Sequence, residues 1–239
     1  MTSPLIRKLA QRGPLRDEER RLLESLPQTT REFATGEDMV RIGERPAFST
    51  LLLSGYCGRY STVGDGSRQI TAVHVAGDFV DLPSFLLHKM DHGIVALSRC
   101  VVMPVAHSIL HDITERFPNL TRLLWLSTLI DTAIHREWLV SMGRRSAAAQ
   151  LAHLLCELAV KLRIVGLGDE RGYRLPFTQG EVADMLGLSA VHAHRVIKDL
   201  RERGLITWRA GKLTINDWAG LEALAEFDPA YLHLETEQR

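Results

Sequence analysis

Residues 178–215 read TQGEVADMLGLSAVHAHRVIKDLRERGLITWRAGKLTI, and this stretch decides the fold of the C-terminal part of the chain. Thr178 and Glu181 have the spacing of a capping box, which predicts a helix that ends at Gly187. Ser189 has the position of an N-cap for a second, longer helix. Two helices joined by a three-residue turn that contains a glycine are typical of a helix-turn-helix.

The second helix, expected over residues 190–203, has one apolar and one polar face. Ala193, Val196, Ile197 and Leu200 recur at helical spacing and predict the face that packs inward. The first two turns of the opposite face are expected to enter the major groove of DNA. With the residues that open each helix, the predicted DNA contacts are Thr178, Gln179, Ser189, Val191, His192, His194, Arg195 and Lys198.

A hairpin is predicted directly after the second helix, and its turn carries Arg209 and Lys212. A hairpin with a basic tip beside a helix-turn-helix is a wing, so these two residues are also predicted DNA contacts. Residues 171–215 hold eight positive and four negative side chains, although the whole chain has 29 of each sign. This segregation of charge favours a polyanionic partner. The alternative is an ordinary α+β core with a charged, solvated face.

Residues 33–105 consist of short apolar runs separated by turn residues. This pattern predicts an antiparallel sandwich or barrel. The clearest hairpin pairs residues 56–63 with 69–75 around a glycine-containing turn. Residues 1–30, which precede this region, predict short helices.

Residues 119–142 predict a long helix, because they contain neither proline nor glycine and repeat apolar residues at helical spacing. The apolar positions cover more than one stripe, so one face is expected to meet the chain's own sheet and another a second copy. Ile130 and Ile134 are predicted to lie in that dimer seam. A single buried core helix is the alternative. Residues 143–145 are predicted to interrupt the helix before another over 146–165.

Taken together, these elements resemble the Crp/Fnr family of transcription regulators. The resemblance rests on Gly36, the turn Gly77-Asp78-Phe79-Val80, the long helix and residues 175–206. It implies an α+β fold: an antiparallel β-roll sensor domain of the jelly-roll type (a double-stranded β-helix), a long dimerisation helix and a C-terminal winged helix-turn-helix. The implied boundaries are 1–116 for the sensor domain with its flanking helices, 117–143 for the dimerisation helix and 144–239 for the DNA-binding domain with its C-terminal helix.

The resemblance also assigns residues on the recognition helix. Arg195 falls on the family arginine that typically bonds a guanine, and a guanidinium suits that bidentate pairing. Val191 falls where the family usually has a base-reading glutamate. Because valine cannot accept a hydrogen bond from a cytosine amine, the usual half-site of the family is not expected here.

The sensor part departs from the cyclic-nucleotide binders of the family. Those members hold the ribose with a glutamate and the cyclic phosphate with an arginine, and Leu82 and His92 occupy these positions here. Leucine cannot bond hydroxyl groups, and a neutral histidine replaces a permanent cation poorly. We therefore expect an unknown small-molecule effector other than cyclic AMP or cyclic GMP, in a pocket around Asp81, Leu82 and His92. No cysteine precedes Cys57, so the N-terminal cluster that would hold iron and sulfur is missing.

Two histidine pairs give the main competing site. His88 and His92, and also His107 and His111, have the i, i+4 spacing that would bind a metal or haem iron on a helix. A cupin-like metalloenzyme, or a ligand-binding β-roll protein that does not bind DNA, is the alternative function. P-loop and G-x-S-x-G motifs are absent from the sequence, so an enzyme is not predicted.

The prediction is a homodimeric, sequence-specific transcription regulator that binds double-stranded palindromic DNA, with RNA polymerase as a further partner. The longest stretch without Asp, Glu, Lys or Arg spans residues 46–58, too short to cross a bilayer. Three widely spaced cysteines without a C-x-x-C motif fit free thiols, and Cys100 and Cys156 are expected in the core. We therefore expect a cytoplasmic protein without a membrane partner.

Overall fold

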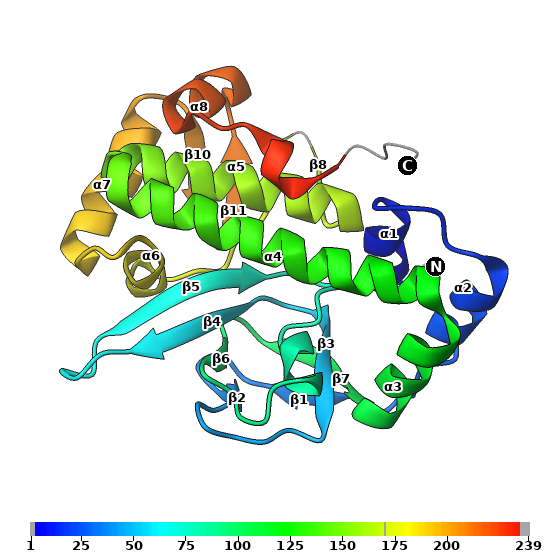
Figure 1. The fold of residues 1–239 in the computed structure, drawn as a ribbon. Helices are drawn as coiled ribbons and strands as arrows, with labels where there is room; N and C mark the ends of the chain where they lie inside the picture. The colour runs from blue at the N-terminus through cyan, green and yellow to red at the C-terminus, as the bar shows by residue number, and fades with distance from the viewer. Residues whose placement is uncertain (1–2, 170, 235–239) are drawn as a thin grey trace. The chain divides into compact units, whose positions relative to one another are not determined.

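A computed structural model describes residues 3–169 and 171–234, which form two compact units. The first unit contains the described residues of 1–60, 73–133 and 232–239. The second contains residues 61–72 and the described residues of 134–231. Runs of helices and runs of antiparallel strands follow one another along the chain, so the predicted α+β class is confirmed (Figure 1).

The first unit is built around an antiparallel β-roll. Two short helices precede it, α1 (Pro4–Ala10) and α2 (Asp17–Glu24). The strands are β1 (Arg31–Phe33), β2 (Asp38–Val40), β3 (Phe48–Ser54), β4 (Cys57–Thr62), β5 (Arg68–His74), β6 (Gly93–Ala96) and β7 (Cys100–Ala106). They form two sheets, with strand orders β1-β7-β3 and β2-β6-β4-β5. Residues 61–72 of the β4–β5 hairpin group with the second unit.

The turn after β5 shows how local sequence fixes the first unit. Gly77 has a φ of +91°, and a Cβ at this position would lie 2.8 Å from the backbone of Pro4. Glycine is therefore required both for the left-handed conformation and for the close approach of α1. The next residue, Asp78, forms an ion pair with Lys8 of α1. A 3-10 turn at Leu82–Phe85 follows this segment.

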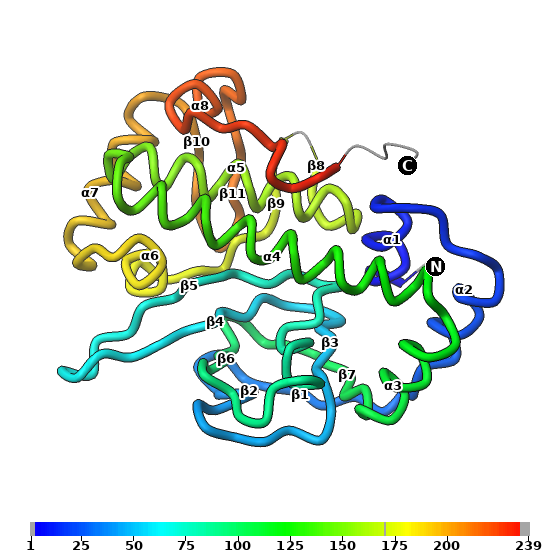
Figure 2. The backbone as a smooth tube through the Cα atoms, viewed as in Figure 1, coloured from blue at the N-terminus to red at the C-terminus, as the bar shows by residue number. Residues whose placement is uncertain are grey.

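Helices α3 (His107–Arg116) and α4 (Pro118–Arg144) follow the roll. The predicted interruption at residues 143–145 is wrong at its first two positions, because α4 continues through Gly143 to Arg144 (Figure 2). A glycine costs a helix only about 1 kcal/mol, which neighbouring packing offsets. Helix α4 ends at Arg144. The Oγ of Ser146 then accepts from the amide of Ala149 and caps the next helix, α5 (Ala147–Val165).

The prediction that Ile130 and Ile134 of α4 face a second copy is wrong. Ile130 and Ile134 are 4% and 6% exposed within the single chain, so they pack inward and cannot form a seam with a second copy. The exposed apolar side chains of α4 are Trp125, Leu129, Leu139, Val140 and Met142. The helix therefore has a buried face and an apolar exposed face, and the alternative of a single buried core helix is wrong.

The second unit surrounds helix α5. Its later elements are β8 (Gly168–Asp169), β9 (Gly172–Arg174), α6 (Gln179–Leu186), α7 (Ala190–Glu202), β10 (Ile206–Arg209), β11 (Lys212–Ile215) and α8 (Trp218–Ala225). Helix α5 is buried along most of its length and packs against α7 and α8. The strands form one antiparallel sheet in the order β10-β11-β9-β8. Among the helices described, none combines the length and apolar character needed to cross a membrane.

Candidate nucleic-acid interface

Helix α6 begins and ends as its sequence predicts. The Oγ1 of Thr178 accepts from the amide of Glu181 at 3.2 Å, and the Oε2 of Glu181 accepts from the amide of Thr178 at 2.7 Å. This capping box satisfies two amides that the first turn leaves without helical partners. At the other end Gly187 has a φ of +65°, which ends α6 and starts the turn to α7.

Helix α7 presents the predicted outward face. The Oγ of Ser189 accepts from the amide of His192 at 3.2 Å and fixes where the helix begins. Ala193, Val196 and Leu200 are buried and Ile197, also predicted to pack inward, is only half-buried, whereas the residues predicted to reach DNA from this helix are exposed. Those exposed residues are Val191, His192, His194, Arg195 and Lys198.

A side-chain contact links the two helices on this face. The amide Nε2 of Gln179, at the start of α6, lies 2.9 Å from Nδ1 of His194 on α7. A groove beside α7 is lined by Gln179, His194, Lys198, Arg201, Thr207 and Arg209. Four predicted contacts, Gln179, His194, Lys198 and Arg209, thus share this groove, whereas Ser189, Val191, His192 and Arg195 line a second depression.

The wing is the hairpin of β10 and β11. Arg209 pairs with Lys212 across a two-residue turn in which Ala210 and Gly211 have φ values of +50° and +69°. Positive φ at both positions is what a tight type I′ turn requires, and it brings both cations to the tip. Trp208 anchors the hairpin, because its Nε1 donates to the carbonyl of Leu175 at 3.0 Å.

Within the second unit, residues 61–72 hold the end of α6. The Nη2 of Arg68 lies 2.7 Å from Oδ2 of Asp184, and its Nε donates to the same oxygen at 2.9 Å. The Nε2 of Gln69 donates to the carbonyl of Met185 at 3.3 Å, a carbonyl in the last turn of the helix. Sequence analysis missed these contacts, since nothing in the hairpin sequence indicates which helix it meets.

The side chains of the residues expected in an effector pocket contact other residues of the first unit. The carboxylate of Asp81 is fully buried and accepts hydrogen bonds from the amide and the hydroxyl of Thr50. Burial raises the pKa of Asp81 to about 6, against the opposing effect of those hydrogen bonds. Leu82 packs against an apolar cluster of the first unit. The Nδ1 of His92 lies 2.5 Å from the carboxylate of Asp91.

Buried charges that sequence analysis did not single out occupy the roll. Arg59 of β4 is 8% exposed and pairs with Asp131 of α4 at 2.8 Å. His74 is also buried, and its Nδ1 lies 3.6 Å from Asp78. Burial lowers the pKa of His74, and the nearby Arg59 lowers it further. The sequence of β4, Cys-Gly-Arg-Tyr-Ser-Thr, has no apolar alternation that would indicate the burial of Arg59.

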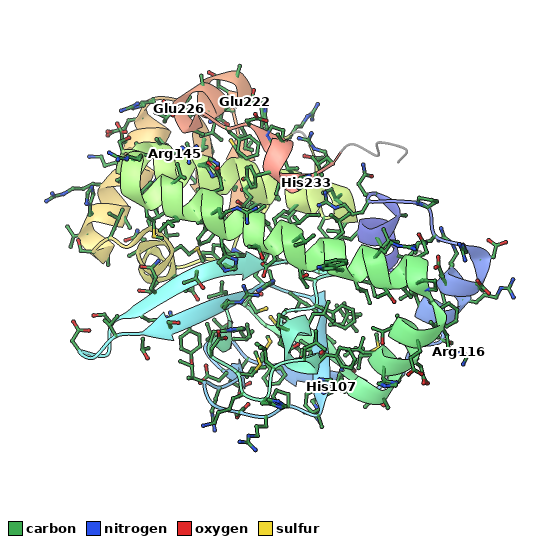
Figure 3. The ribbon with its side chains drawn as sticks, in the orientation of Figure 1. His107, Arg116, Arg145, Glu222, Glu226 and His233 are labelled. Carbon is green, nitrogen blue, oxygen red and sulfur yellow. The ribbon has the colours of Figure 1, made fainter. Side chains whose placement is uncertain are left out.

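The histidine pairs do not form metal sites. His88 and His92 lie outside any helix, so their spacing does not place them on one face. His107 and His111 are on α3, but Nε2 of His107 lies 3.2 Å from the hydroxyl of Ser84, and its ring packs edge-on against Phe85 (Figure 3). His111 is exposed and faces Glu115. Among the described residues, no three His, Cys, Asp or Glu side chains are grouped as metal ligands.

All three cysteines are free and buried, which confirms the expected core positions of Cys100 and Cys156. Burial is the main cause of the raised pKa of each thiol, to about 11 for Cys100 and about 12 for Cys156. Because the thiolate is the reactive form, these thiols are held in their unreactive state.

Two family models match the chain, one over the β-roll and the other over the helix-turn-helix and its wing. The cyclic nucleotide-binding domain matches residues 30–117, and the Crp-like helix-turn-helix domain matches residues 149–224. The chain belongs to the Crp/Fnr family of transcription regulators. Helices α6 and α7 lie within the matched helix-turn-helix domain, and membership of this family implies DNA binding.

Named relatives agree with this assignment. The transcriptional activator protein FnrL of Cereibacter sphaeroides is 24% identical over 80% of this chain and 78% of its own length. The fumarate and nitrate reduction regulatory protein of Vibrio cholerae is 23% identical over 85% and 81%. Among solved structures, FixK2 from Bradyrhizobium japonicum has the same fold, with a TM-score of 0.73, 23% identity and coverage of 82% of this chain and 96% of FixK2.

Proposed function

We propose that this Crp/Fnr regulator binds a palindromic operator as a homodimer and reads each half-site with α7. The observation that carries this proposal is the exposed face of α7, with Arg195 and Lys198 one turn apart opposite a buried apolar stripe. Arg195 presents a planar fork to a guanine edge. The polar side chains of Thr178, Gln179 and Ser189 at the starts of α6 and α7 suit phosphate oxygens, as do the cations of the wing.

Helix α4 is the proposed dimer seam. Trp125, Leu129 and Leu139 are 64%, 52% and 68% exposed, which is unfavourable for large apolar side chains in water. Trp125, Leu129 and Leu139 fall in a register that alternates spacings of four and three residues, as in a coiled coil, and the polar residues Thr132 and Arg136 occupy its intervening positions. A second copy of α4 would cover this seam, and a dimer of helix-turn-helix domains reads two half-sites about one turn of DNA apart.

The proposed domains are residues 1–116 for the sensor, 117–143 for the dimerisation helix and 144–239 for DNA binding. In this scheme the protein acts in the cytoplasm by binding DNA and contacting RNA polymerase, and it has no catalytic role. The α7 face and the wing favour this scheme over a ligand-binding roll whose C-terminal part binds protein.

The proposed effector is a small molecule other than cyclic AMP or cyclic GMP. Leu82 packs in an apolar cluster, and His92 is paired with Asp91, so neither offers the groups that a ribose or a cyclic phosphate needs. The buried cation Arg59 is already neutralised by Asp131. Titration calorimetry with each nucleotide is expected to show no binding at micromolar concentrations. Micromolar affinity for either nucleotide would contradict this part of the proposal.

The experiment for DNA binding uses a library of randomised palindromes. The wild-type protein is expected to select one sequence, and its affinity for that sequence should fall steeply as salt rises because several phosphates are neutralised. Arg195→Glu should abolish selection. The matched control is Lys89→Glu, a charge reversal at an exposed residue outside the interface. If the wild type selects no sequence, or Arg195→Glu still selects the same one, the proposal fails.

A further inference from the structure

We infer that Val191 recognises the methyl group of a thymine in each operator half-site. This inference rests on the proposed docking of α7 in the major groove and names the base that one residue of α7 reads there. Its basis is the position of an exposed apolar side chain among the polar groups of the helix.

Val191 lies at the centre of the outward face of α7. It is 64% exposed, whereas Leu200, nine residues later, is fully buried. Nine residues at about 100° each place the two side chains on opposite sides of the helix. Because Ser189 caps the helix, Val191 is in its first turn, the part that reaches base edges when a recognition helix enters the groove.

Nothing in the stability of α7 accounts for a valine at this position. A β-branched residue has a lower helix propensity than the long polar residues around it. The side chain of Val191 is nevertheless largely exposed, in an open depression that it lines together with Ala147, Ala148 and Val196 and with the polar residues Ser189, His192, Arg195 and Asp199. An apolar partner outside the chain would give its two methyl groups the contact that the fold does not provide.

The chemistry of the major groove identifies that partner. The thymine C5-methyl is the apolar group that base pairs display there, whereas cytosine displays an amine that needs an acceptor. Valine has no acceptor and would leave that amine without a partner. Arg195 follows Val191 by one turn, about 6 Å along the helix. The thymine is therefore expected within about two base pairs of the guanine that Arg195 reads.

The experiment removes methyl groups from each side of the contact. In the operator selected by the wild type, the thymine is replaced by uracil, cytosine or 5-methylcytosine in both half-sites. The wild type should bind the uracil operator about fourfold more weakly per half-site, since one buried methyl contact is lost. The wild type should bind the 5-methylcytosine operator more tightly than the cytosine operator, because 5-methylcytosine restores the methyl group that cytosine lacks.

The matching protein variant is Val191→Ala, which removes both methyl groups and favours helix formation. It should bind the thymine and uracil operators equally. Lys198→Ala is the control and should weaken both operators while keeping their ratio. Equal binding of the two operators by the wild type, or an unchanged ratio in Val191→Ala, overturns the inference. Such a result leaves operator selection intact, whereas failure of the proposed function is seen earlier, as the absence of any selected operator.

Discussion

The Nη1 of Arg59 lies 2.8 Å from Oδ2 of Asp131, which joins strand β4 to helix α4 within the first unit. The side chain of Arg59 is 10% exposed and that of Asp131 is 29% exposed. Burying a guanidinium is costly unless its charge is paired, so the carboxylate is what allows Arg59 to lie inside the roll. The pair connects the proposed sensor to the helix that carries the exposed seam.

Removing one partner of this pair should cost more than removing both. Asp131→Leu leaves Arg59 buried without its carboxylate and is expected to lower the free energy of unfolding by about 2–3 kcal/mol. The double variant Arg59→Leu/Asp131→Leu should recover most of that loss, because no charge remains inside. Urea unfolding of the wild type, both single variants and the double variant measures the coupling. Additive losses would show that the two groups do not interact.

Charging the exposed seam of α4 should separate the dimer. Leu129→Glu places a like charge on both copies of a coiled-coil-like contact, so the variant is expected to be a folded monomer with much weaker operator binding. Leu167→Glu is the matched control, because Leu167 is similarly exposed but lies in the loop after α5. Light scattering after gel filtration measures the mass of each variant. A dimeric Leu129→Glu would place the interface elsewhere.

The elements defined by local sequence were predictable. The capping box at Thr178 and the glycine at Gly187 act within a few residues, so the bounds of α6 followed from the sequence alone. The burial of Ile130 was not predictable, because an all-round apolar pattern does not show which face packs inside. Strand β9 was also missed. Three residues give too short a pattern, and the tight approach of Gly172 to Leu213 depends on long-range pairing.

His153 should contribute a loss of stability in mild acid, which is opposed by buried Asp81, whose raised pKa favours the folded chain over the same range. His153 is 2% exposed, with its ring stacked on Tyr231 and its Nε2 3.5 Å from Oε1 of Glu137. Burial and the nearby Arg145, which also pairs with Glu137, lower its pKa to about 4, and Glu137 opposes this only partly.

Between pH 6.5 and 4 the unfolded chain therefore binds a proton at His153 that the folded chain does not. The contribution of this residue to the unfolding free energy should fall as the pH is lowered through that window, by up to about 3 kcal/mol. In His153→Phe this contribution is absent, so stability should fall less with decreasing pH than in the wild type; buried His74 still acts in the same direction as His153, and Asp81 acts in the opposite direction. His111→Gln, at an exposed histidine, should keep the pH dependence of the wild type. Denaturation midpoints from pH 4 to 7 give the comparison, and parallel curves for the wild type and His153→Phe would refute the assignment.

Arg195 and Lys198 are one turn apart on α7, yet replacing each of them by alanine should change DNA binding in a different way. The guanidinium fork of Arg195 matches both acceptors of a guanine, so Arg195→Ala should cost about 1–3 kcal/mol at the selected operator and flatten the preference at one base pair per half-site. The ammonium groups of Lys198 and Lys212 suit phosphates, which carry no sequence information.

Lys198→Ala and Lys212→Ala should therefore weaken all sequences nearly alike and make binding less dependent on salt. Library selection at two salt concentrations measures both effects for each variant. Lys212 provides an independent check, because it lies on the wing and not on α7. If Arg195→Ala kept its full base preference while Lys198→Ala lost it, Lys198 would be the base-reading residue, and α7 would enter the groove turned about its axis from the orientation proposed here.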